Sequence, residues 1–424
     1  NLEAKLYPVD SDRKIEDIRL RHLLQKYLQK KELSYYVLEE TIIIKPEKEI
    51  PKDKLPEKKK TWSISGFIYD SLTAERLPYS LVVYNPGNIV STSNINGFFS
   101  IQDLSKIEGT LDIRYMGYVP KTIELKEIDN NTELKVAMQP INSMLKEVLV
   151  EGNPNRIVEL GEDVSKISIN PAQMEHLPNL GEVDIFRSIQ LLPGINGTFE
   201  TASSINIRGS APDHNLILFD GFNVYHLDHF FGIFSAFNNN AIKNIQVFKG
   251  GFEAKYGGRV GGVLDITGKT GSSEKPILGV GINFIGFNAL AEVPIGKKTN
   301  FFFAARRSMT DILPSPSYRE LIENVLNNDL NTEATNEYKS YDELDPIFNF
   351  YDLNAKITHR FSDRDFLQID NTSDFPNLTF NSENRTRWGN IGLGLSYSKQ
   401  WEKNLYSDFS LGYTKNLSRV TYGA

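Results

Sequence analysis

The chain has 424 residues, 40% of them hydrophobic and 24% charged, and this length exceeds one ordinary domain and supplies several cores. Its net charge of −7 and the lack of basic runs interleaved with aromatics argue against nucleic-acid binding, and the absence of cysteine removes disulfides, thiolate metal sites and a cysteine nucleophile. No run of 18 apolar residues occurs, which excludes membrane-spanning helices but not tilted strands of about 9–11 alternating residues.

Residues 1–45 predict an amphipathic helix followed by a hairpin. The β-type runs Ser34–Leu38 and Thr41–Lys45 form the hairpin. The apolar stripe of the helix consists of Ile15, Ile18, Leu23, Leu24, Tyr27 and Leu28. The string LLQKYLQKKELSYYVLEETIIIKP resembles the second half of the secretin/TonB short N-terminal domain, which implies an inner-membrane regulator as a partner. A helical adaptor without a signalling role explains the same pattern.

A charged, proline-containing linker at residues 46–60 precedes a small β-sandwich predicted at residues 61–140. Apolar and polar residues alternate from Trp62 to Ile68, four further β-type runs follow, and Asn96-Gly97 marks a turn. The strings SGFIYDSLTAERLPYSLVVY and LDIRYMGYVPKTIEL resemble the carboxypeptidase regulatory-like domain. That resemblance implies a non-catalytic spacing or docking role, and this stretch has no zinc-binding His/Glu set.

Residues 141–155 contain a predicted extended strand that could be recruited by another protein. β-Branched and charged residues alternate, and Gly152 and Pro154 bound the run, so its edge is free for β-augmentation. The LxEVxV pattern resembles a TonB box, which implies the TonB energy-transducing protein as a partner. The alternative is a strand of the preceding sandwich. The residues concerned are Leu145, Lys146, Glu147, Val148, Leu149 and Val150.

Residues 156–270 predict a compact mixed α/β domain. A helix is expected from Asp184 to Leu192, and short β-type runs separated by glycine turns leave little room for helical crossovers. The order of motifs resembles the plug of a TonB-dependent outer-membrane receptor of Bacteroidota type, which implies a domain that blocks a barrel and moves when pulled from the periplasm. The motifs are LLPG, Arg208, Gly209, Asp220, Gly221, Lys249, Gly250, Tyr256, Gly257, Gly258 and Arg259.

The positions of two arginines in this domain indicate an ionic contact. Arg208 and Arg259 lie beside glycines, which leave each guanidinium free for a bidentate carboxylate partner, and Asp220 is one candidate. A latch between plug and barrel is one interpretation. Turn residues that pack the plug are the other.

Two stretches have the length and chemistry of an apical ligand-binding loop, Asn196–Ser203 with Ala211–Asn215 and Tyr225–Phe234, and the second carries the candidate residues. A plug that closes a barrel presents only its apical loops to the outside, and this loop combines aromatic rings with imidazoles, which suit a planar chelate or a sugar ring. A hydrophobic anchor against the barrel wall explains the same residues. The histidines are spaced i,i+3 outside a helix, so no metal site is predicted. The candidate residues are Tyr225, His226, His229 and Phe230.

Residues 271–424 predict about seven strands at the start of a transmembrane antiparallel β-barrel. Apolar residues recur at every second position, as from Leu278 to Ile282 and from Tyr351 to Ile357, and short connections alternate with long ones. Half of a soluble sandwich shows the same alternation. Seven strands cannot enclose a plug, and the family's barrel has 22 strands, so we expect the coding sequence to continue.

The predicted fold class is therefore mainly β: a small α+β N-terminal segment, a β-sandwich, a mixed α/β plug and the N-terminal part of a transmembrane antiparallel β-barrel. The resemblance implies TonB-dependent active transport of a scarce nutrient, a metal chelate or an oligomeric nutrient, across the outer membrane, with the N-terminal domains in the periplasm. The alternatives are a receptor that signals to an anti-sigma factor and a non-transporting structural subunit of an outer-membrane assembly.

No catalytic motif, cofactor or metal site is predicted. The expected partners are the TonB energy-transducing protein, outer-membrane lipid and, for the signalling alternative, an inner-membrane regulator. The string KGGFEAKYGGR differs from that of the starch-utilisation branch, which disfavours a lid lipoprotein as a partner.

Overall fold

The computed structural model describes residues 28, 33–38, 41–46 and 62–422, with gaps at 86, 126–132, 142–158, 161–164, 175–183, 198–203, 230–231, 233, 284–285, 314–315, 317–318, 321–346 and 381–383. The chain divides into two compact units, Asn1–Thr61 and Trp62–Ala424. In the first unit β1 (Leu33–Leu38) pairs antiparallel with β2 (Thr41–Pro46), which confirms the predicted hairpin. The predicted helix lies outside the described residues except for Leu28, which is helical.

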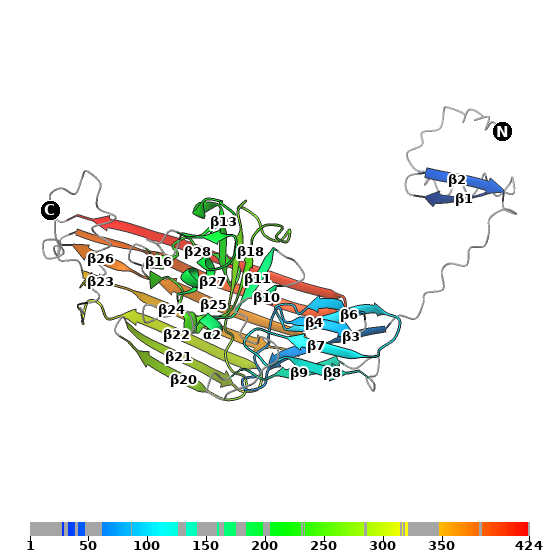
Figure 1. Cartoon of the computed structure of the whole chain (residues 1–424), viewed down its shortest axis with the longest axis horizontal. Helices are drawn as coiled ribbons and strands as arrows, with labels where there is room; N and C mark the ends of the chain where they lie inside the picture. Colours follow the sequence, from blue (N-terminus) through cyan, green and yellow to red (C-terminus); the bar gives the residue numbers. More distant parts are fainter. Residues whose placement is uncertain are drawn as a thin grey trace, which may run out of the picture. The chain divides into compact units, whose positions relative to one another are not determined.

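Two sheets form the sandwich, a name used here for residues 62–141. One sheet has the order β6 (Phe98–Leu104), β3 (Trp62–Asp70), β9 (Glu133–Met138), and the other has the order β5 (Ile89–Thr92), β4 (Leu81–Asn85), β7 (Thr110–Arg114), β8 (Lys121–Glu124) (Figure 1). Alternate residues such as Ile68, Val82 and Leu111 meet in a fully buried core. The five expected runs are strands, and the unexpected β5 and β8 are mostly exposed edge strands without a strong apolar period.

A six-stranded sheet organises the mixed domain, a name used here for residues 159–268. Its order is β10 (Glu159–Leu160), β11 (Lys166–Ile169), β18 (Ile242–Phe248), β19 (Val263–Gly268), β14 (Leu216–Phe219), β15 (Phe222–Asn223). Smaller elements surround it: α2 (Pro171–Met174), α3 (Ile185–Gln190), β12 (Ile195–Asn196), β13 (Asn206–Ile207), η3 (Pro212–His214), β16 (Asp228–His229), β17 (Phe234–Ser235) and η4 (Asn239–Ala241). The Asp184 carboxylate caps α3 by accepting bonds from the Phe186 and Arg187 backbone amides, which confirms the predicted helix start.

In the described part of residues 277–421, nine antiparallel strands form one sheet, which is called the wall sheet here. The long strands lie side by side in the order β20 (Ile277–Ile282), β21 (Gly286–Ile295), β22 (Thr299–Ser308), β24 (Tyr351–Arg360), β25 (Asp365–Asp374), β27 (Asn384–Glu402), β28 (Leu405–Thr421) (Figure 1). The short strands β23 (Ile347–Asn349) and β26 (Asn377–Phe380) pair with each other. Seven long strands match the expected number, and the two short ones lie where long connections were expected.

In a water-soluble protein the apolar face of a sheet is buried and its polar face is exposed. The wall sheet has the opposite arrangement. Its apolar face is exposed, with Leu278 at 78% and Val280 at 82%. Its polar face is buried, and that face carries Asn300, Arg306, Asp352, Asn354, Lys356, Thr358, Gln368 and Asp370. The mixed domain covers the polar face, as the contact of Phe222 with Gly392 shows. The wall sheet thus directs its polar side chains inward and its apolar side chains outward.

Among the described residues, no helix combines the length and apolarity that crossing a membrane requires. The fold-class prediction of a mainly β chain is confirmed.

Candidate functional site

The contact between the mixed domain and the wall sheet is centred on a two-residue turn. Asp220 and Gly221 connect β14 to β15, and both have positive φ, 48° and 89°, as the type I′ hairpin turn requires. Because this turn projects the Asp220 side chain from the end of β14, its carboxylate reaches across to β24. The Asp-Gly motif therefore sets both the turn and the direction of the charge.

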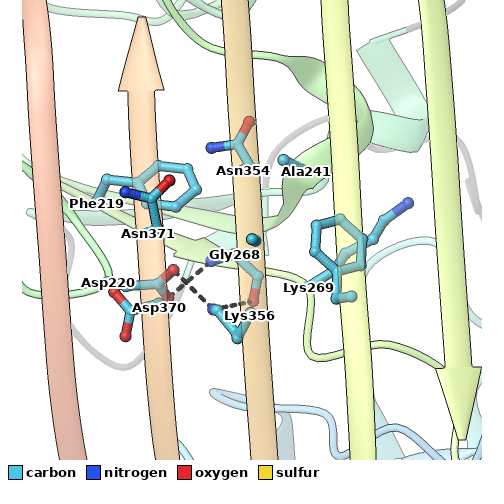
Figure 2. Close-up of a pocket in the computed structure, with 11 residues that line it drawn as sticks. Phe219, Asp220, Ala241, Gly268, Lys269, Asn354, Lys356, Asp370 and Asn371 are labelled. Atoms are coloured by element: carbon cyan, nitrogen blue, oxygen red, sulfur yellow. Dashed lines mark hydrogen bonds and ion pairs between the residues drawn. The ribbon is translucent and has the colours of Figure 1, made fainter.

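Asp220 forms a buried ion pair with Lys356 of the wall sheet. Its Oδ2 lies 2.7 Å from Lys356 Nζ, and the two side chains are 3% and 4% exposed. The Gly268 backbone completes the link, because its N–H donates to Asp220 Oδ1 at 3.0 Å and its carbonyl accepts from Lys356 Nζ at 3.3 Å (Figure 2). Removing one partner from such a pair leaves an uncompensated buried charge, so this contact holds the two parts together.

The surroundings of this ion pair are polar and incompletely bonded. A small pocket beside it is lined by Asn354, Asp370 and Asn371 from β24 and β25 (Figure 2). Asp370 Oδ2 and Asn354 Oδ1 are buried without a hydrogen-bond partner among the described residues. When a polar contact opens, water can replace its hydrogen bonds. The contact around Asp220 is therefore better suited to separation than an apolar core is.

A second cluster of charges joins the two parts through His229. Its Nε2 lies 2.7 Å from Asp352 Oδ1 on β24, and Arg306 Nε on β22 donates to Asp352 Oδ2 at 2.6 Å. Arg306 also donates to the Ser235 carbonyl of the mixed domain at 2.6 Å. The His229 ring is fully buried and lies 4.4 Å from that of Phe350. Its side chain therefore faces the wall sheet.

Tyr225 and His226 are held differently, through their backbone. Asn390 of β27 accepts bonds from both backbone amides at 3.2 Å and donates to the His226 carbonyl at 2.8 Å. This leaves the Tyr225 side chain 53% exposed. Burial lowers the pKa of the half-buried His226 imidazole, against the opposing effect of Asp228. The fourth candidate, Phe230, lies outside the described residues.

The remaining motif residues do not meet Asp220, so the hypothesis that Asp220 pairs with Arg208 or Arg259 is wrong. Arg208 has a φ of 50° in an exposed turn, and Arg259 donates to the Gly258 carbonyl at 3.0 Å. Asp220 instead reaches β24, where it pairs with Lys356. Lys249, in turn, donates to the Pro193 carbonyl at 3.1 Å.

Tyr256 has a role inside the mixed domain. Its hydroxyl donates to Asp265 Oδ2 at 2.7 Å, and burial raises the pKa of this carboxyl group above its usual range. The partners that the sequence reading missed are Lys356, Asp352 and Arg306. In the sequence, each of these residues is a charge at a polar position of an alternating strand. A strand that faces a water-filled lumen has the same pattern, so the pattern alone does not indicate a contact with the mixed domain. The TonB-box candidate, 145–150, lies outside the described residues.

The turn that follows β3 joins the sandwich to the mixed domain and to the segment that connects the mixed domain to the wall sheet. Glu75 Oε1 accepts from the Thr270 backbone N–H at 2.5 Å and its hydroxyl at 2.8 Å, and lies 3.1 Å from Lys243 Nζ. Burial raises the pKa of Glu75, but Lys243 and the bonds from Thr270 outweigh it, so this pKa lies below its ordinary value. Burial lowers the pKa of Lys243 although Glu75 opposes the shift.

The sandwich also reaches the short turns of the wall sheet. Asp363, between β24 and β25, lies 3.2 Å from Arg76 Nη2 and 2.9 Å from Lys135 Nζ. Arg364 in the same turn pairs with Glu133 at 3.0 Å, and Lys403 in the β27–β28 turn donates to Ser63 at 3.1 Å. All of these contacts lie at one end of the wall sheet, the end with the short turns.

Comparison with known families matches two parts of the chain. Residues 163–263 match the TonB-dependent Receptor Plug Domain, and residues 64–150 match the CarboxypepD_reg-like domain. No curated protein matches the chain.

Several solved structures are similar over part of their length. The siderophore receptor PirA from Acinetobacter baumannii is 17% identical, with a TM-score of 0.42, over 61% of this chain and 41% of its own. A mutant of the ferric enterobactin receptor PfeA from Pseudomonas aeruginosa, in complex with enterobactin, is 16% identical, with a TM-score of 0.42, over 61% and 42%. The hemophore receptor HasR from Serratia marcescens is 13% identical, with a TM-score of 0.43, over 61% and 38%. The chain thus spans about two fifths of the length of these structures.

Proposed function

We propose that this chain belongs to an active transporter of the outer membrane. Residues 163–263 match a TonB-dependent receptor plug domain, and residues 64–150, which precede it in the chain, match a carboxypeptidase regulatory-like domain. The transported ligand is a scarce nutrient, either a metal chelate or an oligomeric nutrient. The mixed domain is the plug, and it is displaced by energy supplied from the inner membrane through the TonB energy-transducing protein.

The observation that carries this proposal is the polarity of the wall sheet. Exposed apolar side chains such as Leu278 and Val280 stand opposite buried charged ones such as Lys356 and Asp370. In water this arrangement exposes a large apolar surface, whereas in a bilayer it places that surface against lipid and the charges against the plug. The sandwich contacts the short turns, and short turns face the periplasm in bacterial barrels of this type.

Energy coupling is proposed to act through the segment 145–150. It connects the end of the sandwich to the start of the mixed domain, so a pull on it is applied to both. A segment that pairs as an added strand uses its backbone N–H groups as donors, and proline removes one of them. A change in this segment should therefore affect transport and leave ligand binding intact.

The experiment begins with a deletion strain grown on defined iron and glycan sources, which identifies the nutrient whose use is lost. Complementation with Val148→Pro is expected to leave the receptor in the outer membrane and the nutrient bound, with uptake abolished. Val148→Thr keeps the N–H and the β-branched shape, and uptake should persist. Normal uptake by the Val148→Pro variant would place the coupling segment elsewhere, and absence of the wild-type receptor from the outer membrane would refute the transporter itself.

A further inference from the structure

A second pocket lies where the sandwich, the mixed domain and the wall sheet meet, beside the turn between β24 and β25. Its volume is about 30 Å³, above the ~10–15 Å³ that one buried water requires. Three cationic side chains line it, one from each part: Arg76 from the sandwich, Lys243 from the mixed domain and Arg360 at the end of β24. The pocket is separate from the aromatic loop, and it adjoins the Asp220 to Lys356 ion pair, because Asp220 and Gly268 also line its wall.

The positive charges of this pocket are only partly compensated. Arg76 pairs with Asp363 and Lys243 pairs with Glu75. Among the described residues, the guanidinium group of Arg360 makes no hydrogen bond or ion pair, whereas its backbone N–H donates to the Lys298 carbonyl. The one carboxylate that lines the pocket, Asp220, is already bound to Lys356. Glu75 and Asp363 act on Arg360 only from a distance, because they pair with Lys243 and Arg76, so no carboxylate of the described residues is in direct contact with its guanidinium group.

Buried polar atoms of two other residues that line this pocket also make no hydrogen bond with the described residues. Asn96 of the sandwich is 6% exposed, and its Nδ2, an N–H donor, has no acceptor among the described residues. Thr358 of β24 is 1% exposed, and its Oγ1 also lacks a partner. Both residues line the pocket with Arg360. The large majority of buried polar side-chain atoms in proteins have a hydrogen-bond partner, so two unbonded groups that line one pocket together with a guanidinium group favour an acceptor at this position.

We propose that this pocket binds a small oxyanion, a phosphate or a carboxylate. The planar guanidinium of Arg360 offers two parallel N–H donors to two oxygens of such a group, and Asn96 Nδ2 and the Thr358 hydroxyl supply further donors. Arg76 and Lys243 add positive charge at short range. Because all three parts of the chain line the pocket, the bound anion fixes the sandwich against the plug and the wall.

The test measures the thermal unfolding of the purified full-length receptor in detergent. Inorganic phosphate, acetate and chloride are titrated separately at constant pH and ionic strength, because a ligand of the folded state raises the Tm until its site is saturated. A saturable rise with phosphate alone identifies a phosphate site, and a rise with acetate identifies a carboxylate site. The same rise with chloride, or no rise with any anion, overturns the proposal.

Matched variants connect the effect to the pocket. Arg360→Gln is expected to raise the apparent Kd of the anion at least tenfold. Arg364→Gln, four residues further along the chain in the same turn, is expected to leave it unchanged, since Arg364 pairs with Glu133 outside the pocket. An unchanged Kd in Arg360→Gln overturns the assignment. Should that variant fail to fold, Asn96→Asp provides the second test, because a carboxylate in the pocket repels the anion. Anion dependence equal to wild type in Asn96→Asp would likewise overturn it.

Discussion

Asp220 illustrates how a single residue of a turn motif can also connect two domains. Asp-Gly is among the few dipeptides that adopt positive φ at both positions at low cost, so the sequence favours this turn for a purely local reason. The same geometry brings the carboxylate to Lys356, which lies 136 positions later and is recognisable only in the folded chain. The Gly268 backbone bonds to both residues, and Asp220 and Lys356 leave no room for a side chain at position 268.

We expect Asp220→Asn to weaken the contact between the plug and the wall by about 3–5 kcal/mol, because it leaves the Lys356 ammonium buried without a counterion. Amide hydrogen exchange in β14 and β15 measures the free energy of local opening. Asp220→Asn combined with Lys356→Met should recover most of the loss. Glu253→Gln breaks an exposed pair with Lys255 and should cost less than about 1 kcal/mol. A loss no larger than that in Asp220→Asn would show that the buried pair does not hold the plug.

The candidate ligand residues divide by their surroundings. We propose Tyr225 and His226 as ligand contacts, whereas the His229 ring is engaged with Asp352. Replacing Tyr225 and His226 together with alanine is expected to weaken affinity for the nutrient identified by growth at least tenfold, about 1.4 kcal/mol. His229→Ala should instead lower the thermal stability, because it leaves Asp352 with one partner fewer. Titration calorimetry and thermal unfolding separate the two effects. Unchanged affinity in the Tyr225 and His226 variant would leave the loop as an anchor.

At the scale of elements, the turn after β3 acts as a clamp between the sandwich and the other two parts. Asp70 fixes its shape by accepting bonds from the Leu72 and Thr73 backbone amides and from the Tyr118 hydroxyl. Glu75 is thereby presented to Lys243 at the start of β18. A plug that moves away from the wall has to leave this clamp or take the sandwich with it.

The absence of cysteine makes this clamp accessible to a direct test. A short cross-linker between Glu75→Cys and Lys243→Cys is expected to reduce nutrient uptake at least tenfold, because it prevents separation of the sandwich from the plug. A reducible linker should allow uptake to recover after reduction. The control is a cross-link between Asn85→Cys and Asp112→Cys, whose side chains are bonded within the sandwich. Full uptake by the cross-linked clamp would show that the sandwich and plug move as one body.

At the scale of the whole molecule, the wall sheet reverses the usual relation between polarity and exposure. Lysine, aspartate and arginine side chains are buried on the face towards the plug, and leucine, valine and phenylalanine side chains are exposed on the other. The plug provides polar partners for the buried face, and the proposed transporter places the exposed face against lipid.

We expect Ile369→Arg, on the exposed face of β25, to destabilise the membrane-inserted protein by about 2–4 kcal/mol and to lower the yield of folded receptor. Heat-modifiable migration on gels reports the folded fraction. Val119→Arg is the matched control, because Val119 is an equally exposed apolar residue of the sandwich, where the added charge meets water. Equal folded yields for the two variants would contradict a lipid-facing wall.

The amino-acid sequence was sufficient for features that depend on near neighbours in the chain. The alternation around Leu278 and Leu353, the capped helix after Asp184 and the Asp220-Gly221 turn follow from period, capping and φ preference, which act over a few residues. Ordered motifs likewise identified the plug and the regulatory-like domain. The choice of partners required the fold, because Asp220 meets Lys356, His229 meets Asp352, and Glu75 meets Lys243 across separations of more than 100 residues. The sequence shows that a charged residue needs a partner when it is buried. The identity of that partner depends on how the turn, the strand register and the docked domain bring distant side chains together.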